Sequence, residues 1–312
     1  MIEKPMWDCE RDLCEMVQDI EPSPSHKSAA SRSHNYLREM LDTGQFSSRI
    51  VDSYLSGSYA RNTALHPIDD VDIIVVVDPA GWPSGFFGGN PPPKKILQSF
   101  ATAIRYRYKQ SSVYVQRRSV RLSLYHLDID VVPAIRITGG RHRVEIPDGD
   151  SGEWIVSAPK AHTEIATEIN QAQGKRFKPL VKLLKHWNAQ LPNSARLKSF
   201  AIETLAATLF RHVNCRSLQE GLRCFFDFVA SRRDQEALYS WPQGYGIHMN
   251  WWAQEIYDIA GTGSNLLARV DGDHCKRFVQ HAARSRDALV LAENARTQES
   301  AARHIAKALR MS

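Results

Sequence analysis

The segment from Val71 to Val77 consists almost wholly of valine and isoleucine, the β-branched residues that are typical of strands. Its longest purely aliphatic part, Ile73 to Val77, is far too short to cross a membrane. A similar segment, Arg49 to Leu55, precedes it, and three or more further strands are expected between Val113 and Ile155. The first half of the chain is therefore expected to contain a β-sheet.

Helical patterns lie on both sides of these strands. One helix is expected over Trp7 to Ile20 and another over Lys94 to Tyr108. From Lys160 onward the pattern is almost wholly helical. The sequence therefore predicts an α+β chain, with a mixed domain that includes the N-terminal helices over residues 1–160 and a helical domain over residues 161–312. A crevice between two such domains is a usual place for a ligand.

The charge of the chain narrows its class only a little. The 312 residues include 40 lysines and arginines and 34 aspartates and glutamates, so the net charge is +6. This modest excess suits an anionic small molecule as well as a nucleic acid. The acidic, mixed N-terminus lacks the form of a secretory signal, and the odd number of scattered cysteines fits a reducing compartment. We therefore expect a cytoplasmic protein that does not bind a membrane.

Some of the five cysteines could bind a metal ion. A zinc site can be drawn from a histidine and three of them: His212, Cys215, Cys224 and Cys275. Their spacing matches no compact zinc pattern, so we interpret the cysteines, with Cys9 and Cys14, as small core residues.

Two short motifs surround the first pair of strands. Gly57 and Ser58 directly follow a strand, and Ser58 can begin a short helix whose backbone N–H groups point at an anion. Asp70 and Asp72 begin the next strand, where alternation places both carboxylates on one face. Such neighbours repel each other unless a cation lies between them, and Mg²⁺ takes oxygen ligands from carboxylates and from substrate phosphates.

A later strand offers a third carboxylate. Asp128 and Asp130 lie on one face of it, and its apolar residues lie on the other. The apolar phase shifts near Tyr125 and His126, which predicts a turn or a bulge there. Because proline cannot donate to a central ladder, we expect this strand to end or to reach a sheet edge at Pro133.

Each feature has a simpler interpretation when it is taken alone. A Gly-Ser pair before a helix is usually a turn with an N-cap, and an Asp-x-Asp pair is usually solvated. The Gly/Pro-rich loop from Asp78 to Pro93 is either a flexible connection or a mobile flap over a cleft. The combination is much rarer than its parts, because Gly-Ser, the acid pair and a further inward acid all adjoin strands.

This combination resembles the nucleotidyltransferase superfamily typified by DNA polymerase beta. The segment from Asp130 to Ala134 more narrowly resembles the oligoadenylate synthetases and the cGAS/DncV-like nucleotidyltransferases (CD-NTases). The segment from Leu180 to Trp187 is similar to the Lys-His-Trp helix of that family, and Leu197 to Leu205 is similar to its Ser-Tyr-x-x-Glu-x-Leu segment, with Phe200 in place of tyrosine. The zinc-thumb pattern of cGAS is not visible.

The resemblance implies a polymerase-beta-like core and a C-terminal helical domain, with the active site in the cleft between them. It implies that Asp70, Asp72 and Asp130 are catalytic and bind two Mg²⁺ ions, or Mn²⁺ in their place, with Asp128 as a second choice for the third acid. It also implies the nucleotide-binding residues: Gly57 and Ser58 for the triphosphate, Lys185 and Ser199 in contact with it, and Phe200 stacked on a base.

The residues of the helical half also fit simpler roles when the resemblance is set aside. Lys178, Lys182 and Lys185 lie opposite an apolar stripe and could form a solvated basic face. Ser199 alone would be a helix N-cap, and Phe200 alone would be a core residue. Only the resemblance favours the functional roles of Lys185, Ser199 and Phe200.

The function implied is template-independent synthesis of a cyclic di- or trinucleotide second messenger from ribonucleoside triphosphates, in bacterial anti-phage (CBASS) defence. ATP is the expected substrate, nucleic acid is not required, and a regulatory protein or a downstream effector is the expected partner. The alternatives are an RNA-tailing enzyme of the poly(A)- or CCA-adding type and a non-catalytic nucleotide- or RNA-binding protein. Basic residues crowd 105–109, 117–121 and 136–143, but basic strands beside a triphosphate site explain them sufficiently.

Overall fold

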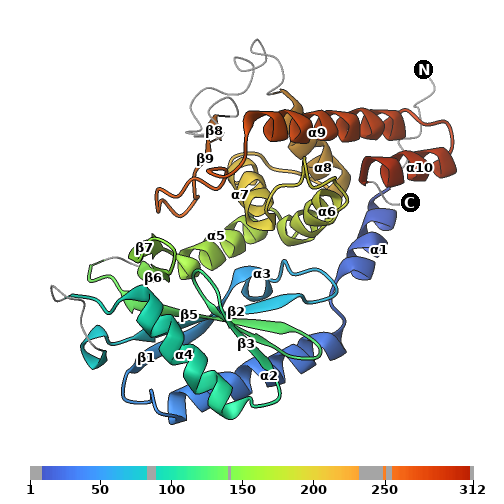
Figure 1. Ribbon diagram of the computed structural model, residues 1–312. Helices are drawn as coiled ribbons and strands as arrows, with labels where there is room; N and C mark the ends of the chain where they lie inside the picture. Colours follow the sequence, from blue (N-terminus) through green and yellow to red (C-terminus); the bar gives the residue numbers. More distant parts are fainter. Residues whose placement is uncertain (1–8, 83–88, 140–141, 232–248, 251–254, 310–312) are drawn as a thin grey trace. The chain divides into compact units, whose positions relative to one another are not determined.

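The computed structural model of the protein describes residues 9–82, 89–139, 142–231, 249–250 and 255–309. The chain divides into two compact units (Figure 1). One, the sheet unit, comprises Pro22–Glu164, and the other, the helical unit, comprises Met1–Glu21 and Ile165–Ser312. The change of unit near residue 164 lies close to the boundary expected at residue 160, but the first helix groups with the helical unit.

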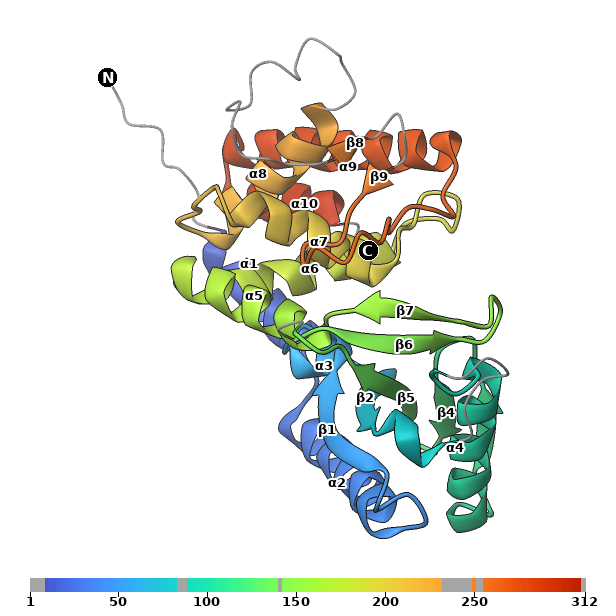
Figure 2. The same cartoon turned by 90° about the vertical axis from the view of Figure 1, so that its left-hand side faces the viewer.

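The described part of the sheet unit contains one seven-stranded mixed sheet. Its strands are β1 (Ile50–Ser56), β2 (Asp70–Val77), β3 (Ser112–Val115), β4 (Val120–Ser123), β5 (Asp128–Arg136), β6 (Val144–Asp148) and β7 (Glu153–Ser157). The order is β1-β2-β5-β4-β3, and β6 and β7 form a hairpin that pairs with the end of β5 (Figure 2). Strands β2 and β5 are parallel, and all other neighbours in this sheet are antiparallel.

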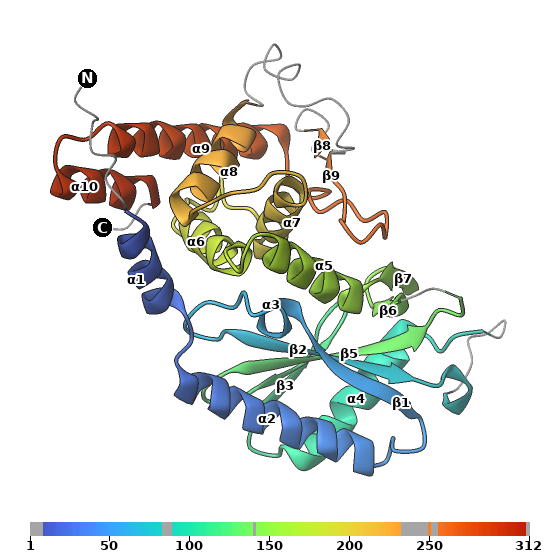
Figure 3. The same ribbon diagram turned by 180° about the vertical axis from the view of Figure 1, so that it is seen from behind.

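The two long helices of this unit, α2 (Pro24–Thr43) and α4 (Pro93–Arg107), cover one face of the sheet. Two short helices, α3 (Gly57–Ala60) and η1 (Pro79–Gly81), follow β1 and β2. Both α2 and α4 lie against the same face (Figures 1 and 3), where Leu37 and Phe100 pack against Val71 and Ile73 of β2. Because side chains alternate along a strand, the intervening Asp72 projects from the opposite face.

Strand β5 continues through Pro133, so of the two expected outcomes the strand does not end there but reaches a sheet edge. The ladder with β4 extends only as far as Val131, and the ladder with β6 begins at Ile135. Between them, β5 has β2 as its neighbour on one side, and no residue that the structure describes pairs with it on the other. The proline therefore lies at a local edge of the sheet, where the missing N–H costs no ladder hydrogen bond.

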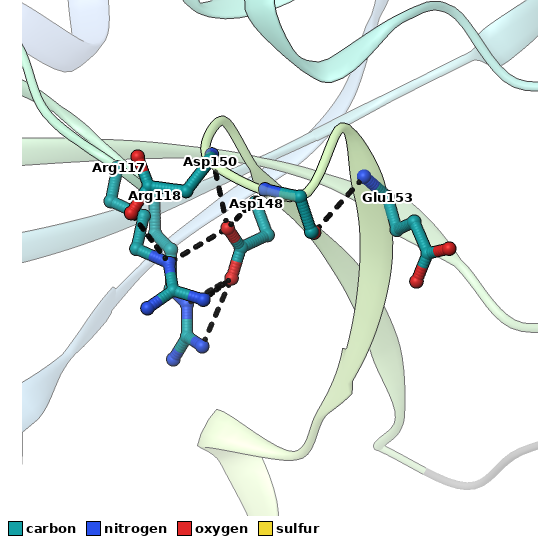
Figure 4. A network of polar contacts seen from close by, with 6 residues as sticks. Arg117, Arg118, Asp148, Asp150 and Glu153 are labelled. Carbon is teal, nitrogen blue, oxygen red and sulfur yellow. Dashed lines mark hydrogen bonds and ion pairs between the residues drawn. The ribbon is translucent and has the colours of Figure 1, made fainter. Parts of the chain in front are cut away.

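A buried carboxylate joins the β6–β7 turn to the β3–β4 turn. Asp148 is 1% exposed and accepts hydrogen bonds from the side chains of Arg117 and Arg118 and from the backbone N–H groups of Asp150 and Ser151 (Figure 4). The hydrogen bond with Arg117 is the main reason why the pKa of Asp148 lies well below its usual value. A fully bonded, buried charge of this kind stabilises the hairpin rather than serving chemistry.

The helical unit surrounds a core of aromatic side chains. Its elements are α1 (Glu10–Ile20), α6 (Phe177–Ala189), α7 (Ser199–Phe210), α8 (Leu218–Ala230), β8 (Met249–Asn250), β9 (Glu255–Ile256), α9 (Gly272–Glu293) and α10 (Gln298–Leu309), while α5 (Pro159–Ala172) spans the boundary. Trp187 is fully buried against Phe226 and Phe278, and its indole N–H donates to Ser285 Oγ at 2.9 Å. The predicted helical half is thus present.

Long-range contacts explain why α1 belongs to this unit. The Glu10 carboxylate accepts from the backbone N–H groups of Leu218 and Gln219, at the start of α8. An acidic group there satisfies free N–H groups and complements the helix dipole. At the other end of α1, Glu21 pairs with the buried ammonium of Lys182 on α6.

The cysteines match the expectation of core residues in part. Cys9, Cys215 and Cys275 are buried, Cys224 is half-buried, and Cys14 is exposed, so the core prediction is wrong for Cys14. The described residues contain no group of three metal-binding side chains that would support the zinc alternative.

Two further expectations concern the surface. The Gly/Pro-rich loop from Asp78 to Pro93 is described only at its ends, by η1 and the residues that lead into α4, and residues 83–88, on which a flap would depend, lie outside the described residues. Among the helices that the structure describes, none has the length and apolar character needed to span a membrane.

Candidate active site

Four carboxylates lie side by side on the face of β2 and β5 that is opposite α2 and α4. Because these strands are parallel and in register, Asp70 lies opposite Asp128, and Asp72 lies opposite Asp130. Neighbouring strands are about 4.8 Å apart, so each pair of carboxylates is within direct electrostatic reach. The predicted placement of Asp70, Asp72 and Asp130 on one face is confirmed.

Asp72 is the carboxylate most affected by this crowding. Its pKa is raised to about 7, first by burial and then by the negative charges of Asp70 and Asp130. Arg61 and Arg121 oppose this rise but do not cancel it. The protein alone therefore does not fully stabilise the charged form of Asp72 at neutral pH, and an additional cation at this position would do so.

The Gly-Ser turn lies directly against this carboxylate. Ser56, the last residue of β1, pairs with Asp72, and the chain then turns into α3. Gly57 has a φ of +68°, and a Cβ atom built there would lie 1.8 Å from Asp72 Oδ2. Only glycine fits both the left-handed backbone and the close approach, so the structure brings Gly57 and Ser58 to the acid cluster.

An arginine that the sequence analysis did not single out lies within the cluster. Arg121 on β4 faces Asp130, and its guanidinium binds both oxygens of that carboxylate, with Nε–Oδ1 at 3.0 Å and Nη2–Oδ2 at 2.7 Å. Its Nη1 also lies 3.0 Å from Asp128 Oδ2, and its Nη2 lies 3.8 Å from Asp70 Oδ2. These contacts, above all the hydrogen bonds with Asp130, raise the pKa of Arg121.

The sequence did contain the signal for this contact. The turn predicted at Tyr125 and His126 joins β4 to β5. A tight hairpin centred on that pair places Arg121 opposite Asp130, which is the observed register. Without the hairpin register, Arg121 is one of several basic residues in 117–121, and only the register identifies Asp130 as its partner.

The other three predicted site residues belong to the helical unit. Lys185 on α6 is 5% exposed, and its Nζ lies 3.1 Å from Glu203 Oε1 on α7. Ser199 is the exposed first residue of α7, and Phe200 beside it is half-buried. The structure thus places these three on α6 and α7, two helices that the Lys185–Glu203 ion pair joins, whereas the other five lie in the sheet unit.

These positions contradict the simpler roles of the lysines and of Ser199. Lys182 and Lys185 are buried and paired with carboxylates, so they do not form a solvated basic face. Ser199 is not the N-cap, because Lys198 occupies that position. Phe200 is only half-buried, as a core residue with one accessible side would also be.

The donor set suits a hard divalent cation. Carboxylate oxygens on neighbouring strands are the ligands that Mg²⁺ and Mn²⁺ prefer, and the raised pKa of Asp72 marks a place that needs positive charge. In the described residues, no three acidic, histidine or cysteine side chains already converge as a metal site. Both oxygens of Asp130 are held by the guanidinium of Arg121.

Comparison with known proteins gives a consistent result. Residues 8–170 match the family model described as the Second Messenger Oligonucleotide or Dinucleotide Synthetase domain. The chain is 34% identical over 282 residues to a cyclic AMP-AMP-AMP synthase from an Acinetobacter species, an alignment that covers 87% of this chain and 75% of that protein. It is 21% identical over 269 residues to the cyclic GMP-AMP synthase CdnE03 of Staphylococcus schleiferi, covering 74% and 83%.

Solved structures show the same fold. The structure of Escherichia coli CdnC with ATP superposes with a TM-score of 0.73 at 22% identity, over 96% of this chain and 97% of that one. The GTP-bound form of Vibrio cholerae DncV superposes with a TM-score of 0.60 at 16% identity, over 83% and 67%. Together with the family match, these findings establish that the chain is a member of the second messenger oligonucleotide or dinucleotide synthetase family, a branch of the CD-NTases.

Proposed function

We propose that this chain joins ribonucleoside triphosphates, with ATP among them, into a cyclic di- or trinucleotide second messenger without a template. The observation that carries the proposal is the row of Asp70, Asp72 and Asp130 on adjoining strands beside the Gly57 turn. The printed names of the relatives, a cyclic AMP-AMP-AMP synthase and a cyclic GMP-AMP synthase, support the product class. On the basis of the same relatives, we also propose that the chain acts in bacterial anti-phage (CBASS) defence.

The acid cluster is the proposed metal and catalytic centre. Asp70 and Asp72 would hold two Mg²⁺ ions, and Asp130 would complete the site on the side of the attacking 3′- or 2′-hydroxyl. The chemistry that such ions would supply is neutralisation of the charge on the α-phosphate and the leaving pyrophosphate. Asp70 and Asp72 suit this role because both are partly accessible on the face opposite the apolar core.

The remaining predicted residues are proposed to bind and orient the nucleotide. Gly57 and Ser58 bind the triphosphate through their backbone and hydroxyl groups, and the close approach of Gly57 to Asp72 fits a triphosphate that contacts both. In the helical unit, Lys185 and Ser199 contact a triphosphate, and Phe200 stacks on a base. Glu203 orients the Lys185 ammonium through their ion pair.

A protein partner is part of the proposal. Escherichia coli CdnC has been solved in complex with a HORMA protein, and its structure covers 97% of this chain with a TM-score of 0.73. We therefore propose that a regulatory protein of this kind controls the present chain and that a downstream effector responds to the product.

The proposal is tested by pyrophosphate release from ribonucleoside triphosphates and Mg²⁺ in the absence of nucleic acid. The wild type should release pyrophosphate, and Asp70→Asn with Asp72→Asn should abolish it. The matched control is Asp69→Asn, which removes an exposed carboxylate next to the cluster. Release that requires an RNA primer would favour the RNA-tailing alternative, and undiminished release by the double variant would refute the assigned centre.

A further inference from the structure

We propose that Arg121 is the resident counter-cation of the acid cluster: it holds Asp130 while the site is free of metal and transfers to Asp128 when divalent cations bind. This inference rests on the proposed function, since it concerns how the same carboxylates become available. It assigns roles to two residues, Arg121 and Asp128, beyond the three acids already named.

The geometry shows one guanidinium serving several carboxylates. Arg121 binds Asp130 through two parallel hydrogen bonds of 3.0 and 2.7 Å, the bidentate arrangement that is strongest between these groups. The Asp130 side chain is 9% exposed, so this contact also provides the positive charge that a buried carboxylate requires.

Metal binding and this contact compete for the same oxygens. Both oxygens of Asp130 accept from Arg121, and a divalent cation at either oxygen would lie within a few ångströms of a guanidinium of like charge. The protein must therefore loosen the Arg121–Asp130 contact when cations bind. Part of the binding energy of the divalent cation is used to displace Arg121 from Asp130, which lowers the apparent affinity of the site for the cation.

Asp128 supplies a second position for the displaced guanidinium. Its Oδ2 already lies 3.0 Å from Arg121 Nη1, so the charge remains paired when the contact with Asp130 opens. The two acids are next-nearest neighbours on one face of β5, and Arg121 faces that same face from β4. The movement is a shift of one side chain between adjacent partners, and the strands need not rearrange.

The competing hypothesis is a purely structural ion pair. Arg121 would then only hold β4 against β5, and its loss would weaken metal binding or leave it unchanged. Displacement predicts the opposite sign, because a site that loses its built-in competitor binds the cation more tightly. The sign of the change in metal affinity therefore separates the two hypotheses.

The test is a titration of the full chain with Mn²⁺, followed by electron paramagnetic resonance of the free ion, for the wild type, Arg121→Gln, Asp128→Asn and the double variant. We expect Arg121→Gln to bind Mn²⁺ on the order of tenfold more tightly, a typical size for coupled binding equilibria. Its metal-free form should melt at a lower temperature than the wild type, and Mn²⁺ should restore the loss. The matched control is Arg118→Gln, which removes an arginine that contacts Asp148 instead.

Asp128→Asn gives an independent arm. It should weaken Mn²⁺ binding several-fold in the wild-type background, because Arg121 then has no second carboxylate outside the proposed metal ligands, and should have no effect when Arg121 is already glutamine. Weakening of equal size in both backgrounds would make Asp128 a direct ligand and overturn the proposed transfer. Unchanged or weaker binding by folded Arg121→Gln would overturn the counter-cation role.

Two further results keep the outcomes distinct. If Arg121→Gln fails to fold, Arg121→Lys replaces it, because a lysine ammonium cannot form the two parallel hydrogen bonds that Arg121 makes with Asp130. Tighter Mn²⁺ binding by this variant than by the wild type would support displacement, and unchanged or weaker binding would refute it. If the wild type binds no Mn²⁺ at all, the proposed metal centre itself fails, which is a different result from equal affinities in wild type and variant.

Discussion

Replacing Gly57 by alanine should inactivate the enzyme through Asp72 rather than through loss of the fold. A Cβ at position 57 would lie 1.8 Å from Asp72 Oδ2, whereas ordinary contact begins at 3.4 Å, so the carboxylate must move by about 1.6 Å. A displacement of about 1 Å of a reacting group can reduce a rate by about 100-fold. We therefore expect pyrophosphate release by Gly57→Ala to fall by about 100-fold or more.

The matched control separates the contact with Asp72 from the cost of the backbone. Gly152 has a φ of +78°, close to that of Gly57, but a Cβ there would meet nothing within 4 Å. Both alanine variants should lose about 1–2 kcal/mol from the left-handed backbone, which corresponds to a melting temperature lower by roughly 2–8 °C. Gly152→Ala should keep activity within a few-fold of wild type, and equal activities of the two variants would refute the steric argument.

The remaining predictions address single side chains. Asp130→Asn should reduce pyrophosphate release far more than Asp128→Asn, and a greater loss for Asp128 would show that the roles are exchanged. Asp72→Asn should raise the melting temperature of the metal-free protein at pH 8, because the raised folded-state pKa of Asp72 means that stability is lost as pH rises through about 7. The gain should vanish near pH 4, and a gain independent of pH would contradict this reasoning. Asp148→Asn should lower the free energy of unfolding, measured by chemical denaturation, by about 2–3 kcal/mol at neutral pH. Because folding lowers the pKa of Asp148, this difference between variant and wild type should shrink as pH falls below about 4. Phe200→Ala should weaken binding of a non-hydrolysable triphosphate by about 1–3 kcal/mol in calorimetry while Phe200→Tyr changes little, and a large loss of melting temperature with unchanged affinity would make Phe200 a packing residue.

The strands that carry the acids could be predicted from the sequence because local pattern determines them. The Val/Ile-rich segment after Asp70 can satisfy its side chains only in a buried strand, and alternation then directs Asp70 and Asp72 away from the core. The same argument placed Asp130 on its face of the sheet. Periodicity therefore placed each acid on a face of its own strand, whereas the grouping of the three acids in one site was implied by the family resemblance.

What the sequence did not predict depends on which residues meet across the chain. Pro133 was expected to end its strand or to lie at a sheet edge, and the choice between these depends on the change of partner of β5 from β4 to β6, which nothing local reveals. The first helix was assigned to the wrong neighbours, because the contact of Glu10 with Leu218 joins residues 208 positions apart. The contact of Arg121 with Asp130 could have been predicted, because it follows from the register of the hairpin whose turn was correctly expected at Tyr125 and His126.

The most direct test of the central claim is the identity of the product. Purified protein, with its regulatory partner where activation requires one, is incubated with Mg²⁺ and all four ribonucleoside triphosphates but no nucleic acid, and the products are treated with phosphatase and weighed by mass spectrometry. The account predicts a phosphatase-resistant ring of two or three nucleotides, because a ring has no terminal phosphate to lose. Linear products that phosphatase shortens, or a ladder that grows only on an added RNA primer, would contradict it.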